Sequence, residues 1–317
     1  MYLFLTRKVR DFVVANRNKG QSIRCYSVNT HITITSRMTT KISLSQRLSS
    51  VTHPVHYKLL LKPDLQTGLF QGTVEIDVVT NKETDSINLH SKYLNISSVR
   101  VVKANEDIPV SFLELKTVEQ LCVKFCEIIQ PDTYRLVFDF CGDLTKSFVG
   151  FYLSKLKDDR TMVASKFEPT YARQAFPCFD EPDFKATYDI SLVKPLTYIA
   201  LSNMNEISRI VEDNGATEIV SFATSVPMST YLACFVVCDF DFKQTEINAN
   251  GIGKNFILRS YSQKDQMHKI DYAQDIGKKA TEFYIRYYEV PFPLPKLDMI
   301  AIPDYVSGAT EHWGLIT

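Results

Sequence analysis

The sequence has no hydrophobic run long enough to form a membrane-spanning helix, which needs about 18 to 20 consecutive apolar residues. Its first apolar cluster, residues 2–5, is also shorter than the core of about 7 to 15 residues in a secretory signal peptide. The chain has no net charge, and this balance argues against the basic surface typical of nucleic-acid-binding proteins. We therefore expect neither a transmembrane segment nor a nucleic-acid partner.

The balanced charge is unevenly distributed. Residues 1–50 contain nine Lys or Arg and one acidic residue, Asp11, a balance of +8, so residues 51–317 carry −8. A basic segment rich in Ser and Thr is typical of a mitochondrial transit peptide. Two alternatives stay open, a disordered leader or an upstream stretch before a start at Met38. We expect a basic leader over residues 1–49 and a cytoplasmic protein; the alternatives are mitochondrial targeting by the leader, or a membrane or secretory location.

Several catalytic and metal-binding patterns are also missing. The six histidines form no metal-ligand pattern, H-E-x-x-H is absent, and no P-loop, G-x-S-x-G elbow or dinucleotide fingerprint occurs. Seven cysteines are too few, and odd in number, for a disulfide framework. The pairs 122/126 and 234/238 lie in strand-like runs, where four residues span about 13 Å, too far for two ligands of one zinc ion. We predict that these four cysteines are buried free thiols.

What the sequence does contain, from residue 50 to 253, is a series of short runs in which apolar and polar residues alternate. This period of two, bounded by Gly, Pro, Asn or Asp, predicts β-strands. The run 231–237 is continuously apolar, which predicts a central strand covered on both faces. We predict one β domain of saddle or sandwich type over residues 50–253. The alternating runs lie at residues 57–61, 73–78, 121–125, 135–140, 188–193 and 219–222.

Residues 254–317 have a different pattern. After a predicted strand at 255–261, apolar residues recur at helical spacing from Ile270 to Tyr288, which predicts a helix of about twenty residues with a wide apolar stripe. The proline-rich stretch 291–295 ends it, and residues 297–302 form another predicted strand. We interpret residues 254–317 as the start of an α/β domain.

Glu311 is the first candidate functional residue. Gly308 and Ala309 precede it, and if this stretch lies extended at a cleft edge, the small residues let a ligand backbone approach closely. A peptide could then pair as an added strand while Glu311 binds its terminal ammonium. From spacing alone, a solvated turn residue is the commoner interpretation of such a Glu.

Charged residues also cluster at 168–181. Glu168 precedes a proline, which predicts an extended backbone and a projecting side chain. Asp180 and Glu181 begin a predicted turn in which either could accept backbone amide hydrogen bonds. Arg173 lies within reach of these acids. For Arg173, Asp180 and Glu181 we favour a structural group of ion pairs over a functional site.

Two motifs together resemble one peptidase family. Residues 166–182 read K-F-E-P-T-Y-A-R-Q-A-F-P-C-F-D-E-P, similar to the signature Q-F-E-x-T-D-A-R-R-A-F-P-C-F-D-E-P. Residues 308–315 read G-A-T-E-H-W-G-L, similar to the exopeptidase signature G-A-M-E-N-W-G-L. Further similar stretches lie at 201–205, 228–232 and 290–296. From about Ser50 onward the chain resembles the zinc aminopeptidases of the aminopeptidase N family, in the branch with puromycin-sensitive and endoplasmic-reticulum aminopeptidases.

The resemblance implies a mainly β fold: a large N-terminal β saddle domain followed by the start of a thermolysin-like catalytic domain. It implies peptide substrates with a free N-terminus, whose α-amino group Glu311 binds with help from Glu168, while Gly308 and Ala309 border the substrate. Thr310 and His312 join this predicted substrate site as departures from the motif Met and Asn. His312 would titrate near neutrality beside Glu311, which Asn cannot do.

The resemblance also implies zinc as the cofactor of the complete family enzyme. The family's zinc ligands and general base follow shortly after this motif, so we expect no metal and no catalytic residue within this sequence, and no activity of this chain alone. The predicted function is the part of a zinc aminopeptidase that binds the substrate N-terminus. The alternative is a non-catalytic, truncated peptide-binding or decoy fragment that lacks the zinc site.

Overall fold

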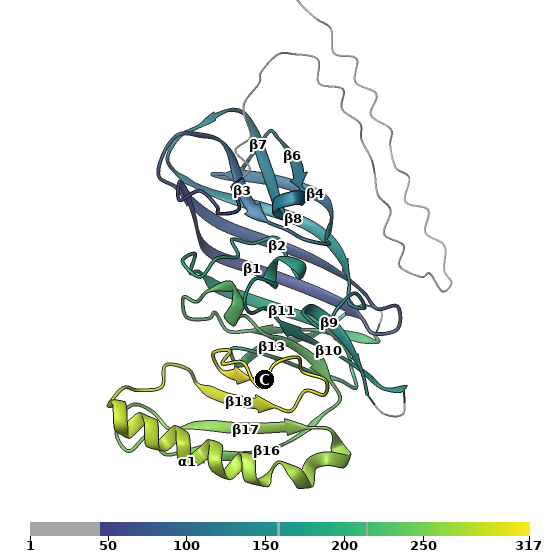
Figure 1. Cartoon of the computed structure of the whole chain (residues 1–317), viewed down its shortest axis with the longest axis vertical. Coiled ribbons are helices and arrows are strands. Elements are labelled where there is room, and N and C mark those ends of the chain that lie inside the picture. The colour runs from purple at the N-terminus through teal and green to yellow at the C-terminus, as the bar shows by residue number, and fades with distance from the viewer. Residues whose placement is uncertain (1–44, 157–158, 214) are drawn as a thin grey trace, which may run out of the picture.

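The computed structural model describes residues 45–156, 159–213 and 215–317 (Figure 1). Most of the predicted leader, residues 1–44, lies outside the described residues. The described chain is mainly β, as predicted, with a single α-helix in that part of the chain. Residues 50–253 and 254–317 remain predicted domain bounds.

A large antiparallel sheet forms the frame of the molecule, with one parallel pair between β1 and β11. Its strands alternate as the sequence predicts: β1 buries Tyr57, Leu59 and Leu61, and β2 buries Val74 and Ile76 on the same side. Each such side chain contributes about 1.5 to 3 kcal/mol on burial. The strand order is β13 (Glu206–Val211), β14 (Thr217–Phe222), β11 (Thr187–Pro195), β1 (Thr52–Asp64), β2 (Leu69–Thr80), β8 (Thr133–Asp143), β4 (Asn95–Lys103) and β5 (Glu106–Ile108).

Two smaller sheets cover the buried face of the large one. The first has the order β3 (Thr84–His90), β7 (Gln120–Ile129) and β6 (Val110–Leu115), with the 3-10 turn η1 (Lys116–Val118) before β7. The second has the order β12 (Ile199–Ser202), β15 (Phe235–Cys238), β10 (Thr161–Lys166) and β9 (Gly150–Lys155). Side chains from all three sheets share one apolar core, so residues 52–238 pack as a unit.

The β9–β10–β15–β12 sheet is covered on both faces, as predicted for its central strand. Val163 and Phe235 face the main core, whereas Met162 and Val236 face a second core shared with the last sheet. The predicted start of this strand at residue 231 is wrong, because Thr230–Leu232 form the 3-10 turn η4 and the strand begins at Phe235. Internal turn hydrogen bonds, Leu232 N to Ser229 O at 3.1 Å among them, withdraw these residues from the ladder.

The last sheet has the order β16 (Asp241–Ile247), β17 (Phe256–Ser262), β18 (Lys296–Ile300) and β19 (Leu315–Ile316), and its last three strands are parallel. The 3-10 turn η5 (Lys264–Lys269) and helix α1 (Asp271–Tyr288) connect β17 to β18, and α1 covers one face of this sheet (Figure 1). The helix was predicted, but its apolar stripe is mostly exposed: Ile285 is its buried residue, and Tyr287 is 68% exposed.

The cysteine prediction holds for some residues and fails for another. Cys122, Cys178, Cys234 and Cys238 are buried free thiols, whereas Cys126, in the second half of β7, is exposed. No helix in the described part of the chain is long and apolar enough to cross a membrane.

Candidate functional site

The segment 308–317 lies between the β9–β10–β15–β12 sheet and the β16–β19 sheet, where Figure 1 shows the C-terminal end. Its ends are joined by two backbone hydrogen bonds, Thr310 N to Thr317 O at 2.9 Å and Thr317 N to Thr310 O at 3.2 Å. Within this closed loop the side chains alternate. Thr310 and His312 are buried, whereas Glu311 and Trp313 are exposed, so the loop presents Glu311 outward.

Asn203, which follows β12, fixes this loop to the β domain. Its Nδ2 donates hydrogen bonds to Leu232 O at 2.7 Å and Trp313 O at 2.9 Å, and its Oδ1 accepts one from Cys234 N at 2.9 Å. Gly314 packs so closely that a Cβ there would lie 2.1 Å from Asn203 O, and its φ is +83°. Only glycine meets both requirements without strain. Three of the stretches quoted above, 201–205, 228–232 and 308–315, therefore meet at Asn203.

Lys296 supports the same junction from β18. Its buried Nζ donates to Ser202 O at 2.7 Å and Gly314 O at 2.8 Å, and it pairs with Asp298 at 2.8 Å. Burial lowers the pKa of Lys296, and the Asp298 carboxylate opposes that shift. The backbone of the Glu311 loop is thus held by polar groups from two sheets.

Glu168 follows the end of β10. Residues 168–171 form a turn, closed by a 2.7 Å hydrogen bond from Tyr171 N to Phe167 O, so the chain changes direction here, and the extended conformation of Glu168 itself stays a prediction. The peptide bond between Glu168 and Pro169 is cis. The Glu168 side chain is 48% exposed and forms a 2.9 Å ion pair with Nζ of Lys166, whose own side chain is only 5% exposed.

Tyr231 contacts Glu311 and is influenced by the charge of Glu168. Its hydroxyl lies 3.4 Å from Oε1 of Glu311. Burial raises the pKa of Tyr231, and the Glu311 and Glu168 carboxylates raise it further, so both charges act on one phenol. We name Glu168, Glu311, Tyr231 and Lys166 the acidic group. Its two carboxylates come from segments 143 positions apart in the chain and could both accept hydrogen bonds from one ammonium.

Gly308 and Ala309 are exposed beside this group, and a Cβ added to Gly308 would meet no atom within 4 Å. The absent side chain therefore leaves open space next to the backbone. The open space agrees with the small residues at 308 and 309, and peptide binding there stays a prediction.

His312 does not behave as predicted. It is 1% exposed, its Nδ1 lies 3.2 Å from Thr317 Oγ1, and no partner for Nε2 lies among the described residues. Burial and then the Lys166 charge lower the pKa of His312 to about 3, so the ring does not titrate near neutrality. Thr310 also faces inward and accepts a 2.7 Å hydrogen bond from the Tyr305 hydroxyl. Thr310 and His312, the two departures from the motif, therefore make their contacts inside the loop and do not face the exposed side with Glu311.

Arg173 forms the predicted structural group. Its Nε donates to Asp180 Oδ2 at 2.9 Å, and its two terminal nitrogens donate to Asp180 O at 3.2 Å and Glu119 Oε2 at 3.1 Å. Thr230 Oγ1 donates to the other Asp180 carboxylate oxygen at 2.7 Å. Glu181 takes different partners, accepting from Leu48 N at 2.7 Å. We call Arg173, Asp180 and Glu119 the arginine group.

Sequence reasoning missed Lys166, Asn203, Tyr231 and Lys296 as parts of the site. All four stand within the stretches quoted for the resemblance, and Lys166 occupies the position where the signature has Gln. That departure was a readable signal. The roles of Asn203 and Lys296 depend on contacts between distant segments, which spacing does not reveal.

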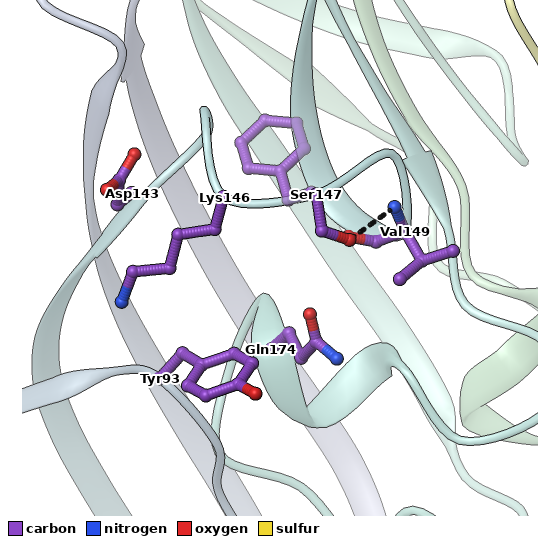
Figure 2. Close-up of a pocket in the computed structure, with 7 residues that line it drawn as sticks. Tyr93, Asp143, Lys146, Ser147, Val149 and Gln174 are labelled. Carbon is purple, nitrogen blue, oxygen red and sulfur yellow. Dashed lines mark hydrogen bonds between the residues drawn. The ribbon is translucent and has the colours of Figure 1, made fainter.

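Two hollows of the described structure lie away from Glu168 and Glu311. Figure 2 shows the smaller, about 10 Å³, in which Tyr93, Lys146 and Gln174 face one another. The larger, about 390 Å³, is an open hollow on the outer face of the large sheet, next to Thr73 and Asp139. Both carboxylates of the acidic group are themselves exposed. The described residues contain no group of three or more His, Cys, Asp or Glu that could hold a metal ion.

Comparison with known proteins supplies the family. Residues 53–232 match the Peptidase M1 N-terminal domain and residues 272–317 the Peptidase family M1 domain. The chain is 36% identical to puromycin-sensitive aminopeptidase of Caenorhabditis elegans over 280 residues, 37% identical to human endoplasmic reticulum aminopeptidase 1 over 280 residues, and 39% identical to bovine glutamyl aminopeptidase over 282 residues. Each alignment covers 86% of this chain and 29% of the relative. The family uses zinc. The chain belongs to the M1 aminopeptidase family, and it spans that family's N-terminal domain and the start of its catalytic domain.

Proposed function

We propose that this chain is the substrate-binding N-terminal part of a zinc aminopeptidase that removes N-terminal amino acids from peptides. In this proposal Glu311 and Glu168 bind the free α-ammonium of the peptide, and Gly308 and Ala309 border the peptide backbone. The observation that carries it is the acidic group, in which Glu311 Oε1 lies 3.4 Å from the Tyr231 hydroxyl and the Glu168 charge also helps to raise the pKa of Tyr231.

The physical argument depends on charge and position. An ammonium has three N–H donors and no acceptor, so two carboxylates that converge on one point satisfy it better than water alone does. A peptide bound in this way has its first residue fixed, which explains removal of residues from the N-terminus only. Glu311 is exposed and, within the described residues, has no ion pair that an ammonium would have to displace.

Zinc enters only as the family's cofactor. When bound, it supplies a metal-activated water for hydrolysis. Because the described residues contain no group that could hold the ion, the role proposed for them is to bind and orient the substrate.

A binding measurement tests the proposal without any need for turnover. Trp313 is the only tryptophan in the sequence, it is 42% exposed, and it lies two positions from Glu311, so its fluorescence reports on this site. We expect Ala-Ala-Ala-amide to change the fluorescence saturably. Glu311→Gln should weaken this binding at least about tenfold, since hydrogen bonds to charged groups are worth about 1.5 to 3 kcal/mol.

Two controls make the result specific. N-acetyl-Ala-Ala-Ala-amide lacks the ammonium and should bind at least about tenfold more weakly. Glu106→Gln removes a similarly exposed carboxylate from the far edge of the large sheet and should leave the titration unchanged. Equal binding of acetylated and free peptides would overturn the proposal.

A further inference from the structure

Lys166 is a buried cation inside a site that is otherwise acidic. It is the last residue of β10, its side chain is only 5% exposed, and its Nζ is 2.9 Å from Glu168 Oε2 and 3.5 Å from Glu168 O. The strands β9 and β15 flank β10 on both sides. The ammonium of Lys166 is therefore held at one place in the acidic group.

This lysine changes the charge balance of the site. Glu168 and Glu311 together carry −2, and Lys166 reduces the total to −1, which one peptide α-ammonium neutralises. A cationic side chain on the first residue would approach the positive charge of Lys166 and be repelled by it. A first residue with a carboxylate side chain would instead meet a positive charge that Glu168 only partly neutralises.

The distances allow that contact. An ammonium bound to Glu168 lies about 2.8 Å from a carboxylate oxygen, so it lies about 5 Å from the Lys166 Nζ bound to the same carboxylate. In an N-terminal glutamate the side-chain oxygens extend about 5 Å from the α-nitrogen. The side-chain carboxylate can therefore reach Lys166 while the α-ammonium stays on Glu168 and Glu311.

We propose that Lys166 is a specificity-determining residue, and that this site selects peptides whose first residue carries a carboxylate, glutamate above all, and rejects those that begin with lysine or arginine. This inference rests on the proposed function of Glu311 and Glu168. The charge of Lys166 acts beyond its own ion pair, because it helps to lower the pKa of the buried His312.

The test compares three peptides, Glu-Ala-Ala-amide, Gln-Ala-Ala-amide and Lys-Ala-Ala-amide, by titration of Trp313 fluorescence in the full chain. Wild type should bind the glutamate peptide about fivefold more tightly than the glutamine peptide, because a half-exposed ion pair contributes a free energy of about that size. The lysine peptide should bind most weakly. Lys166→Glu should reverse the order. Lys166→Gln should abolish the difference between glutamate and glutamine.

A matched control is available on the same hairpin. Lys155 pairs with Thr161 at the opposite end of the β9–β10 ladder, about 17 Å along the strand from Lys166, and it is exposed. Lys155→Gln removes the same charge and should preserve the wild-type order. Thermal unfolding of each variant establishes that it is folded before it is titrated.

The outcomes separate this inference from the proposed function. If free peptides bind more tightly than acetylated ones but folded Lys166→Glu and Lys166→Gln keep the wild-type order, Lys166 does not determine specificity and the inference fails alone. If acetylation and Glu311→Gln change nothing, the proposed function fails first. A preference for glutamate that weakens as salt concentration rises would support the electrostatic origin.

Discussion

The arginine group and the acidic group each take two members from residues 166–182, yet they differ in how completely their charges are satisfied. Asp180 is 1% exposed and accepts from Arg173 and Thr230 through both carboxylate oxygens. Glu168 is half-exposed and pairs with Lys166, and the contact of Glu311 among the described residues is the 3.4 Å one with Tyr231. A buried group whose carboxylate oxygens all have hydrogen-bond partners stabilises the fold. An exposed carboxylate with few partners can still accept hydrogen bonds from a ligand. This difference should appear in the free energy of unfolding of variants of the two groups.

The largest expected effect comes from breaking the arginine group. Arg173→Met leaves the Asp180 carboxylate buried without its cation, and such a loss costs about 3 to 5 kcal/mol. We expect the free energy of unfolding, measured by urea titration followed by circular dichroism, to fall by that amount.

A matched arginine provides the control. The Arg100 guanidinium lies 3.7 Å from an Asp107 carboxylate oxygen, and both side chains are more than half exposed. Arg100→Met should therefore change the free energy of unfolding by less than about 1 kcal/mol. If Arg100→Met and Arg173→Met lowered the free energy of unfolding equally, the buried, fully hydrogen-bonded state of the arginine group would not explain its contribution to stability.

An intermediate effect is expected from His312, which is buried inside the loop that presents Glu311. Its pKa is about 3 in the folded chain and about 6.5 unfolded, so the unfolded state binds more protons between these values. Its contribution to stability is complete above pH 6.5 and is lost as the pH falls toward 3. At pH 5 the loss is about 2 kcal/mol.

His312→Asn should remove this part of the acid sensitivity. Between pH 7 and pH 5 the variant should lose about 2 kcal/mol less stability than wild type. His90, near the arginine group, also has a pKa lowered by burial, to about 4, and supplies a residual slope with the same sign in both proteins. Identical pH profiles for the two proteins would contradict the buried, neutral state of His312.

The sequence predicted the fold better than the site because strands follow from a local pattern, whereas the site depends on contacts between residues that are far apart in the sequence. Alternation alone located β1, β2, β8 and β11, since one face of each strand is buried. The direction of His312 is set by closure of its loop between Thr310 and Thr317 and by the contact with Asn203. The proline after Glu168 did not reveal the turn at residues 168–171, because that turn is closed by the hydrogen bond from Tyr171 N to Phe167 O.

The smallest effect on stability is expected in the acidic group, where a substitution should affect ligand binding more than folding. Glu168→Gln keeps an oxygen that can accept from Lys166, and water screens the half-exposed position, so the loss should be below about 1 kcal/mol. The same variant should still weaken binding of Ala-Ala-Ala-amide several-fold in the Trp313 titration, because one of two carboxylates for the ammonium is gone. Arg173→Met should behave oppositely, with low stability but unchanged affinity in the fraction that stays folded. If Glu168→Gln destabilised the chain as much as Arg173→Met, the Lys166–Glu168 pair would be structural, and Glu311 would be left as the sole ammonium-binding carboxylate.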